Sequence, residues 1–272
     1  MSRYTRPEIK QITKQWVREN CRITDRDKGL LRLLSERNRR LLRRDQIEAL
    51  YPEFASTDRL NKRIKHLFKL HIIDKIYPPV GLGEGSSKQY ICLDRAGAIL
   101  MELEKYNKPI TTDTLGNRSL PLGWEHKVML NDYECQIVEC MREWGGAIRL
   151  YEVEEPHPYN DTTIKPDITA LLQCGGKGYI FFIEADMGTE DIPYVKKKIE
   201  AYKDYYISNR WHSRPWNKTF KNPVFPRVLF LTEDDRPKRI QTLKEYCEGS
   251  NIRFFFGTHS EFKSILQSII KG

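Results

Sequence analysis

Two short apolar runs, joined by a glycine turn and bordered by acids, constrain the fold of this chain more than any other feature. Asp167 opens the first run, Ile168–Gln173, and the second run, Tyr179–Ile183, leads into Glu184-Ala-Asp186. Runs rich in β-branched and aromatic residues around a glycine turn predict a β-hairpin. Such a hairpin would bring the three acids to one end of a sheet.

The acids at the strand ends have two interpretations. Acids in such places often form turns or simply face water. Here, however, Pro166-Asp167 and the acid-x-acid sequence are followed by an amphipathic segment that carries Lys196, Lys197 and Lys198. Since Mg²⁺ is usually held by one or two carboxylates together with water and phosphate, this combination predicts a metal and phosphodiester site.

The composition is that of a soluble globular protein with one or two domains. Of the 272 residues, 39% are hydrophobic and 31% are charged. No stretch approaches the roughly 20 apolar residues of a membrane span, and the N-terminus has no apolar signal core. The six cysteines are scattered without a CxxC pair, which is typical of reduced thiols. We therefore expect a cytoplasmic protein with no membrane partner.

The excess positive charge lies in the first quarter of the chain. Residues 1–75 contain twenty Lys and Arg against ten Asp and Glu, a net charge of +10, whereas the other 197 residues contain 26 and 27, a net charge of −1. Such asymmetry predicts a nucleic-acid-binding module joined to a second part. The alternative is a basic surface that only meets solvent.

Residues 25–106 predict the shape of that module. Helices are expected over 25–36, 45–51 and from Ser56 or Thr57 onward, then strands over 72–77 and 88–93 around a Gly/Pro/Ser loop, and a closing helix over 94–106. This order resembles the winged helix-turn-helix domain, whose second helix of the pair enters the major groove of double-stranded DNA. The third helix carries basic residues mostly off its apolar face, and these are the predicted DNA contacts: Arg59, Lys62, Lys65, His66 and Lys69. A winged domain used for protein contacts is the alternative.

The rest of the chain predicts a second domain. Residues 107–120 are mostly polar and are expected to link a domain of residues 1–106 to one of residues 121–272. The second part predicts a helix, three strands, a helix, a strand, a helix, a strand and a helix, hence a mixed sheet flanked by helices. The predicted fold class is α+β with two domains.

Within that part, the aromatic and basic segment 202–227 contains Trp211 and Trp216. It suits either stacking on unpaired bases or packing as a loop on the sheet edge. We favour packing, because tryptophan is mostly buried.

The second part resembles the core of restriction-endonuclease-like PD-(D/E)xK nucleases. The wider pattern resembles the replication-relaxation family of plasmids and other mobile elements: a winged helix, a linker, Glu125-His126 at a helix start, then KPDITALL, FFIEADMGTED and KKKIEAYKDYY. The resemblance covers roughly residues 25 to 260 and is sharpest over 164–206. It implies a metal-dependent enzyme that cuts DNA, with Mg²⁺ or Mn²⁺ as cofactor.

The resemblance also implies roles for single residues. Asp167 and Glu184 match the metal-binding acids, and Asp186 would be a further metal ligand. Asp186 stands where the motif has its lysine, so Lys198 from the following helix is the best candidate for the catalytic ammonium. His126 is either an additional site residue or a packed residue at a helix start.

Two functions follow. One is a DNA-binding protein of plasmid or mobile-element replication, relaxation or maintenance that nicks or cleaves DNA with a metal ion. The other is a non-catalytic DNA-binding regulator whose degenerate nuclease fold serves dimerisation or partner binding. They differ in whether Asp167, Glu184 and a lysine ammonium converge.

The basic third helix generates the first prediction. Replacing Lys62, Lys65 and Lys69 with Ala should weaken DNA binding and flatten its salt dependence, because fewer counterions are released per complex. The measurement is the dissociation constant as a function of salt concentration. Unchanged affinity and slope would remove this helix from the DNA interface.

Overall fold

The protein is α+β and divides into two compact units, residues 1–135 and 136–272. The computed structural model describes residues 7–36, 39–78, 88–188 and 190–272. Most of the predicted loop 78–87 lies outside the described residues. Among the described residues, no helix is long and apolar enough to cross a membrane.

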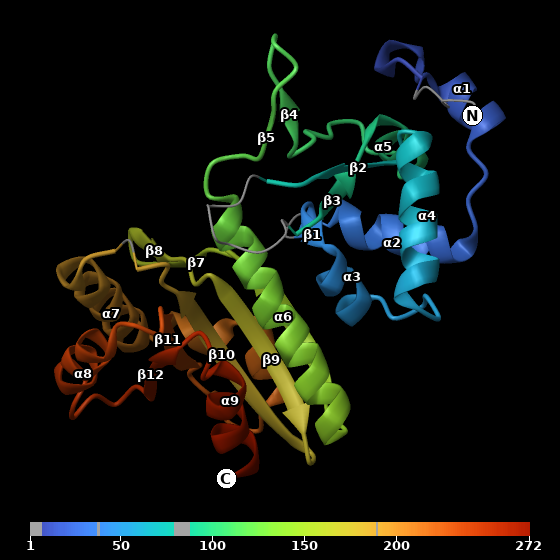
Figure 1. Cartoon of the computed structure of the whole chain (residues 1–272). Helices are drawn as coiled ribbons and strands as arrows, with labels where there is room; N and C mark the ends of the chain where they lie inside the picture. The colour runs from blue at the N-terminus through green and yellow to red at the C-terminus, as the bar shows by residue number, and fades with distance from the viewer. Residues whose placement is uncertain (1–6, 37–38, 79–87, 189) are drawn as a thin grey trace. The chain divides into compact units, whose positions relative to one another are not determined.

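In the first unit, short helices pack around a small antiparallel sheet (Figure 1). The sheet has the order β1-β3-β2. In chain order, the helices and strands of the first unit up to residue 100 include α1 (Lys14–Asn20), α2 (Asp25–Ser35), β1 (Leu42–Arg43), α3 (Arg44–Leu50), α4 (Thr57–Lys69), β2 (Ile73–Ile76), β3 (Tyr90–Leu93) and α5 (Arg95–Leu100). The predicted third helix and both predicted strands are confirmed. The closing helix is shorter than predicted, since it ends at Leu100 instead of continuing to residue 106.

Helix α4 forms as its sequence predicts. The Ser56 hydroxyl accepts a hydrogen bond from Arg59 N at 3.3 Å and caps the helix. Leu60, Ile64 and Leu67 are buried on one face. The cations at positions 59, 62, 65, 66 and 69 stay in solvent, so the apolar stripe is the face of α4 that packs on the unit.

A buried charge ties α4 to α2. Asp27 completes a capping box with Thr24 at the start of α2 and is wholly buried. Arg63 of α4 pairs with it through Nε at 2.7 Å and Nη2 at 2.5 Å. These bonds to Arg63 and Thr24 keep the pKa of Asp27 below its ordinary value in spite of burial.

Residues 107–120 were predicted to be a linker, but they lie inside the first unit. They contain a hairpin of β4 (Thr111–Thr112) and β5 (Arg118–Ser119). Ile110 is 1% exposed, and the Lys108 ammonium lies 3.0 Å from Asp74 and 3.3 Å from Asp94, both buried. Arg118 pairs with Asp74 at 2.6 Å. The polar composition of this segment therefore reflects its ion pairs with the sheet.

The unit boundary falls within helix α6 (Trp124–Trp144), between Cys135 and Gln136. The first half of α6 carries acids that pair with arginines of the first unit. Asp132 pairs with Arg43, and the buried Glu134 pairs with Arg39. These pairs, which are distant in sequence, place residues 124–135 with the first unit.

The second unit is built on a five-stranded mixed sheet with the order β12-β11-β10-β9-β6. Strands β6, β9 and β10 are antiparallel, while β10, β11 and β12 are parallel. Its elements are β6 (Ala147–Val153), β7 (His157–Tyr159), β8 (Thr162–Ile164), β9 (Ile168–Cys174), β10 (Lys177–Ala185), α7 (Ile192–Ile207), β11 (Arg227–Thr232), α8 (Pro237–Tyr246), β12 (Phe254–Thr258) and α9 (Phe262–Lys271). The mixed sheet flanked by helices is as predicted.

The β9-β10 hairpin sets the register of the site. Gly175 and Gly176 turn the chain with φ of +56° and +75°, a region that glycine enters without strain. Cys174 pairs with Lys177, and at the other end Ile168 pairs with Ile183. Asp167 comes just before Ile168 and Glu184 just after Ile183, so the two acids lie side by side at this end of the hairpin.

An aromatic core covers the face of the sheet that packs against α7. Trp211 and Trp216 are 7% and 3% exposed, which confirms that their segment packs as a loop. His157 is buried among Phe182, Tyr205 and Trp216. Burial, aided by the charge of Arg214, lowers the pKa of His157 to about 4.

The position of the unit boundary generates a prediction about fragments. A fragment of residues 7–106 should be less stable than one of residues 7–135 by at least about 3 kcal/mol, because the cut removes the cations of two buried acids, Asp74 and Asp94. It also removes Glu134 and Asp132, each one of two acids that pair with Arg39 and Arg43. Urea denaturation measures the difference. As a control, Leu115→Ala in the longer fragment should change stability by less than about 0.5 kcal/mol, since Leu115 is 84% exposed. Equal stability of the two fragments would instead support a domain boundary at residues 107–120.

Candidate functional site

The hairpin brings two of the predicted acids together at the end of the sheet. Asp167 directly precedes β9, and Glu184 is the penultimate residue of β10. The backbone N–H of Ala185 donates a hydrogen bond to Asp167 Oδ2 at 2.8 Å. This bond holds the Asp167 carboxylate beside the strand that carries Glu184.

Helix α7 supplies two donors to Glu184. The Glu184 side chain is buried, with 4% of the residue exposed. Tyr202 donates its hydroxyl to Oε1 at 2.5 Å, and Lys198 Nζ lies 3.1 Å from Oε2. Lys198 also contacts Glu190 Oε1 at 2.8 Å. Because Lys198 and Tyr202 are four residues apart on a helix, both reach the same carboxylate.

The pKa values of this cluster follow from burial and charge. Burial, and then the neighbouring charge of Asp167, raises the pKa of Glu184 to about 7, against the lowering effects of Lys198 and Tyr202. Burial by itself would lower the pKa of Lys198, but Glu184, Glu190 and Asp167 raise it overall. Burial also raises the pKa of Tyr202, so its phenol stays protonated. The site therefore combines a carboxyl group that titrates near neutrality with a permanent ammonium.

The structure does not bring Asp186 to the other two acids. Its side chain pairs with Arg239 of α8 at 2.5 Å and accepts hydrogen bonds from Thr232 Oγ1 and Gly188 N at 3.2 and 2.9 Å. Throughout the described ranges, no group of three or more His, Cys, Asp and Glu residues is arranged to hold a metal ion. Asp167 and Glu184 thus remain as a pair.

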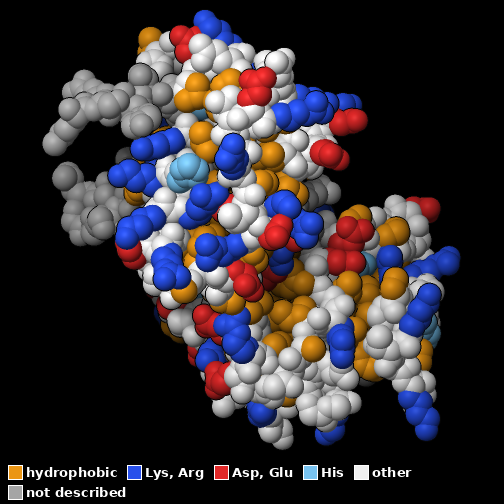
Figure 2. All heavy atoms as spheres, turned by 90° about the vertical axis from the view of Figure 1, so that its right-hand side faces the viewer, with side chains coloured by type: hydrophobic (Ala, Val, Ile, Leu, Met, Phe, Trp, Pro, Cys, Tyr) orange, Lys and Arg blue, Asp and Glu red, His pale blue; other side chains and the backbone are white. Residues whose placement is uncertain are grey.

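The predicted DNA contacts all lie on the exposed surface of α4. Arg59, Lys62, Lys65, His66 and Lys69 are each exposed. Partial burial and the charges of Arg63 and Lys69 lower the pKa of His66, so it is mostly neutral at physiological pH. Figure 2 shows lysine and arginine side chains gathered around a histidine on the side of the molecule that α4 faces in Figure 1.

His126 lies in the first turn of α6 and is half-buried. It belongs to the first unit, whereas Asp167 and Glu184 belong to the second. Its role in the site stays a prediction.

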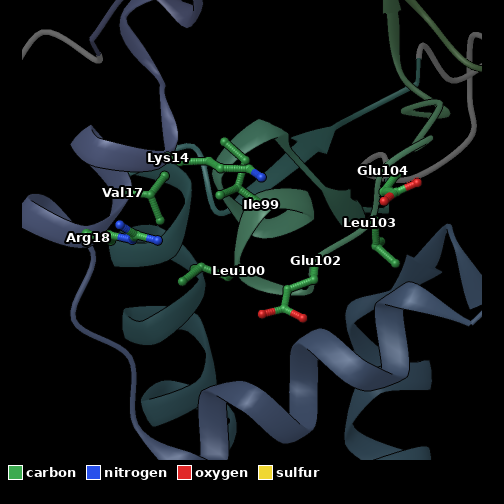
Figure 3. A pocket seen from close by; sticks show the side chains of 8 residues that line it. All are labelled: Lys14, Val17, Arg18, Ile99, Leu100, Glu102, Leu103 and Glu104. Atoms are coloured by element: carbon green, nitrogen blue, oxygen red, sulfur yellow. The ribbon is translucent and has the colours of Figure 1, made fainter.

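Among the described residues of the first unit, two hollows bear on function. One of about 830 Å³ lies between α1 and the end of α5, and Figure 3 shows Lys14 and Arg18 on one side of it and Glu102 on another. Its cations and acids balance. The second, of about 540 Å³, lies beside α4 and β2, and its lining includes Arg44, Lys65, Lys75 and Lys88. We call this second hollow the basic groove.

Sequence reasoning missed several residues of these sites. Tyr202 could have been found, because it stands one helical turn after Lys198. Arg239 could not, because nothing local links it to Asp186, 53 positions earlier. In the basic groove, Lys75 lies within one predicted strand and Lys88 begins the next, so the predicted pairing of these strands points to a shared basic surface.

Comparison with known proteins supplies a family. The family model described as replication-relaxation matches residues 31–219, which is more than half of the 272-residue chain. The chain belongs to the replication-relaxation family. No curated protein matches the chain. Membership associates the protein with the replication or relaxation of plasmids and other mobile elements, and thereby with DNA.

The matched range contains the whole of both predicted sites. It includes α4, the β9-β10 hairpin and α7, with Asp167, Glu184 and Lys198. Strands β11 and β12 and helices α8 and α9 lie beyond it. Arg239, the partner of Asp186, is therefore outside the residues that the family model matches.

The raised pKa of Glu184 generates a prediction about pH. The folded state favours the protonated carboxyl group, so it binds more protons than the unfolded state between about pH 4.5 and 7. The contribution of Glu184 to stability is therefore full below pH 4.5 and is lost as pH rises to 7, by roughly 3 kcal/mol. Glu184→Gln should remove this loss, as measured by urea denaturation across the window.

The comparison of variant with wild type isolates this group. His157 acts in the opposite direction, because its lowered pKa makes stability rise with pH between about 4 and 6.5, and it is present in both proteins. Asp161→Asn, at an exposed acid in a turn, is the control and should leave the profile unchanged. If Glu184→Gln also leaves the profile unchanged, Glu184 is ionised in the fold.

Proposed function

We propose that this replication-relaxation protein binds double-stranded DNA through its first unit and cleaves it at a metal-dependent site in its second. The observation that carries the proposal is the 3.1 Å contact between Lys198 Nζ and Glu184 Oε2, in a cluster that also contains Asp167. The lysine that the nuclease motif would place at position 186 is thus replaced by one from α7. Family membership supports DNA of a plasmid or other mobile element as the substrate.

The first unit supports the DNA-binding part of the proposal. From α2 to α5, its order of helix, strand, two helices, two strands and helix supports a winged helix-turn-helix domain, in which α4 would enter the major groove. The exposed cations of α4 would contact phosphates and base edges. The apolar face of α4 is already used in the core of the unit, which leaves only its charged face for a partner.

The pair of carboxylates in the second unit fits Mg²⁺ or Mn²⁺. Hard cations prefer oxygen ligands, and Mg²⁺ commonly takes only one or two carboxylates from the protein. Asp167 and Glu184 would hold it, together with water and phosphate oxygens. When bound, the cation would polarise the phosphoryl group and lower the pKa of water.

The protein's own residues have separable tasks at this site. Lys198 would neutralise charge that develops on the phosphoryl oxygens. Tyr202 orients the Glu184 carboxylate through its hydrogen bond to Oε1. Glu190 accepts from Lys198 and holds the ammonium at the edge of the cluster, where 29% of the Lys198 side chain reaches solvent.

A second candidate is a non-catalytic DNA-binding regulator, in which the second unit serves dimerisation or partner binding. One observation favours it. Both oxygens of Glu184 already accept hydrogen bonds from Lys198 and Tyr202, so the carboxylate is neutralised within the fold. On this account the cluster is structural and the cation is not needed.

A metal and cleavage experiment separates the two candidates. Mg²⁺ or Mn²⁺ should raise the melting temperature of the wild type, because the ion binds the folded state and relieves the repulsion between the carboxylates. Asp167→Asn and Glu184→Gln should abolish the rise, and both should be more stable than wild type without metal. Supercoiled plasmid should be nicked by the wild type but not by these variants or Lys198→Ala.

Helix α7 offers a matched control. Lys197 is the exposed neighbour of Lys198, and Lys197→Ala should keep both the metal response and the nicking. A metal-induced rise that persists in both carboxamide variants would move the metal elsewhere and remove the nuclease proposal. If the wild type shows no rise and no nicking, the regulator is the better account.

A further inference from the structure

The basic groove has the composition of a binding site for a single nucleotide unit. Its lining includes four cations, Arg44, Lys65, Lys75 and Lys88, against one acid, Asp45. That acid is already paired with Arg43 at 2.9 Å. The groove therefore presents a surplus of positive charge, as a phosphate-bearing ligand requires.

The groove also contains an aromatic ring. Tyr77 follows β2, lines the groove and is 54% exposed. The Gln89 amide donates a hydrogen bond to its hydroxyl, which holds the edge of the ring and fixes its orientation. An exposed tyrosine held in this way is suited to stack on a base, since every base presents a π face.

The cations around the ring are positioned by the fold. Lys75 lies on β2, and its ammonium stands over the Phe68 ring of α4 at 5.0 Å from the centroid. Arg44 begins α3 and Lys65 lies on the exposed side of α4, so three elements contribute charge. Asn61 of α4 adds an amide that can pair with a base edge.

The size of the groove decides between a phosphate and a whole nucleotide. Its volume of about 540 Å³ lies within the range of sites that enclose small organic ligands. A duplex keeps its bases stacked, so it offers phosphates and base edges to a protein surface but no base face on which Tyr77 could stack. A duplex backbone would satisfy the four cations, but it would leave Tyr77 in the same hollow without a partner.

We propose that the basic groove takes an unpaired nucleotide of DNA, with the base stacked on Tyr77 and its phosphates held by Lys65, Lys75 and Lys88. The inference rests on the proposed DNA binding and goes further, because it makes the first unit a reader of locally opened duplex. A bubble or a single-stranded branch would supply such a nucleotide. The duplex beside it would remain available to α4.

The experiment compares three DNA probes of one sequence and length with the full-length protein. They are a perfect duplex, a duplex with a central bubble, and the single strand, and fluorescence anisotropy gives each dissociation constant at one salt concentration. The wild type should bind the bubble more tightly than the duplex. Tyr77→Ala should weaken binding to the bubble and the single strand about tenfold, because a tenfold loss is the scale of one lost base stack. It should leave duplex binding unchanged.

Two further variants and one spectroscopic signal sharpen the result. Tyr77→Phe keeps the ring and should bind the bubble within about twofold of wild type. Leu115→Ala removes an exposed apolar side chain of the first unit, outside the groove, and should change nothing. A 2-aminopurine in the bubble should be quenched by the wild type and not by Tyr77→Ala.

Three outcomes would overturn the inference. If the wild type binds duplex but shows no preference for the bubble, or if Tyr77→Ala weakens all three probes equally, the groove holds duplex backbone and DNA binding itself stands. If the wild type binds none of the probes, the proposed DNA binding fails as well.

Discussion

The carboxyl group of Glu184, buried between another acid and an ammonium, is the constraint on which the second unit depends. An isolated charge in such a place would destabilise the fold by several kcal/mol. Two hydrogen-bond donors from α7 offset the cost of burying this charge. Burial also raises the pKa of Glu184 to about 7, so that the group can accept a proton. Helix α7 must therefore dock in one position, and Val195 and Ile199, buried on the sheet side of the helix, hold it there.

The end of β10 carries a second buried charge pair that is separate from the first. Asp186 lies two residues after Glu184 but pairs with Arg239 of α8, so each acid has its own cation from its own helix. A lysine at position 186 would place a second cation beside Arg239 and leave that arginine without its acid. Under the proposed nuclease function, Asp186 in place of the motif lysine and Lys198 from α7 would be two parts of one arrangement of charge.

The features that sequence predicted well are those set by local patterns. The hairpin register follows from the apolar runs and from Gly175 and Gly176, and the face of α4 follows from the spacing of Leu60, Ile64 and Leu67. The segment 107–120 was misjudged because Lys108 and Arg118 find their acids on β2 and at the start of α5, more than ten positions away. Polar residues next to Pro and Gly have the composition of a linker whether or not they have buried partners elsewhere in the fold. For the same reason, the sequence around Asp186 does not predict its ion pair with Arg239.

The origin of Lys198 in a helix has a consequence for how the site can be controlled. In a strand-borne motif, the acid and the lysine share one backbone and cannot separate. Here the ammonium and the Tyr202 hydroxyl both come from α7, so any shift of that helix removes both donors from Glu184 together. Without them, Glu184 loses the two contacts that lower its pKa, while the charge of Asp167 still raises it. The protonation of Glu184 and the docking of α7 are therefore coupled, and a ligand that favours ionised Glu184 also favours the docked helix.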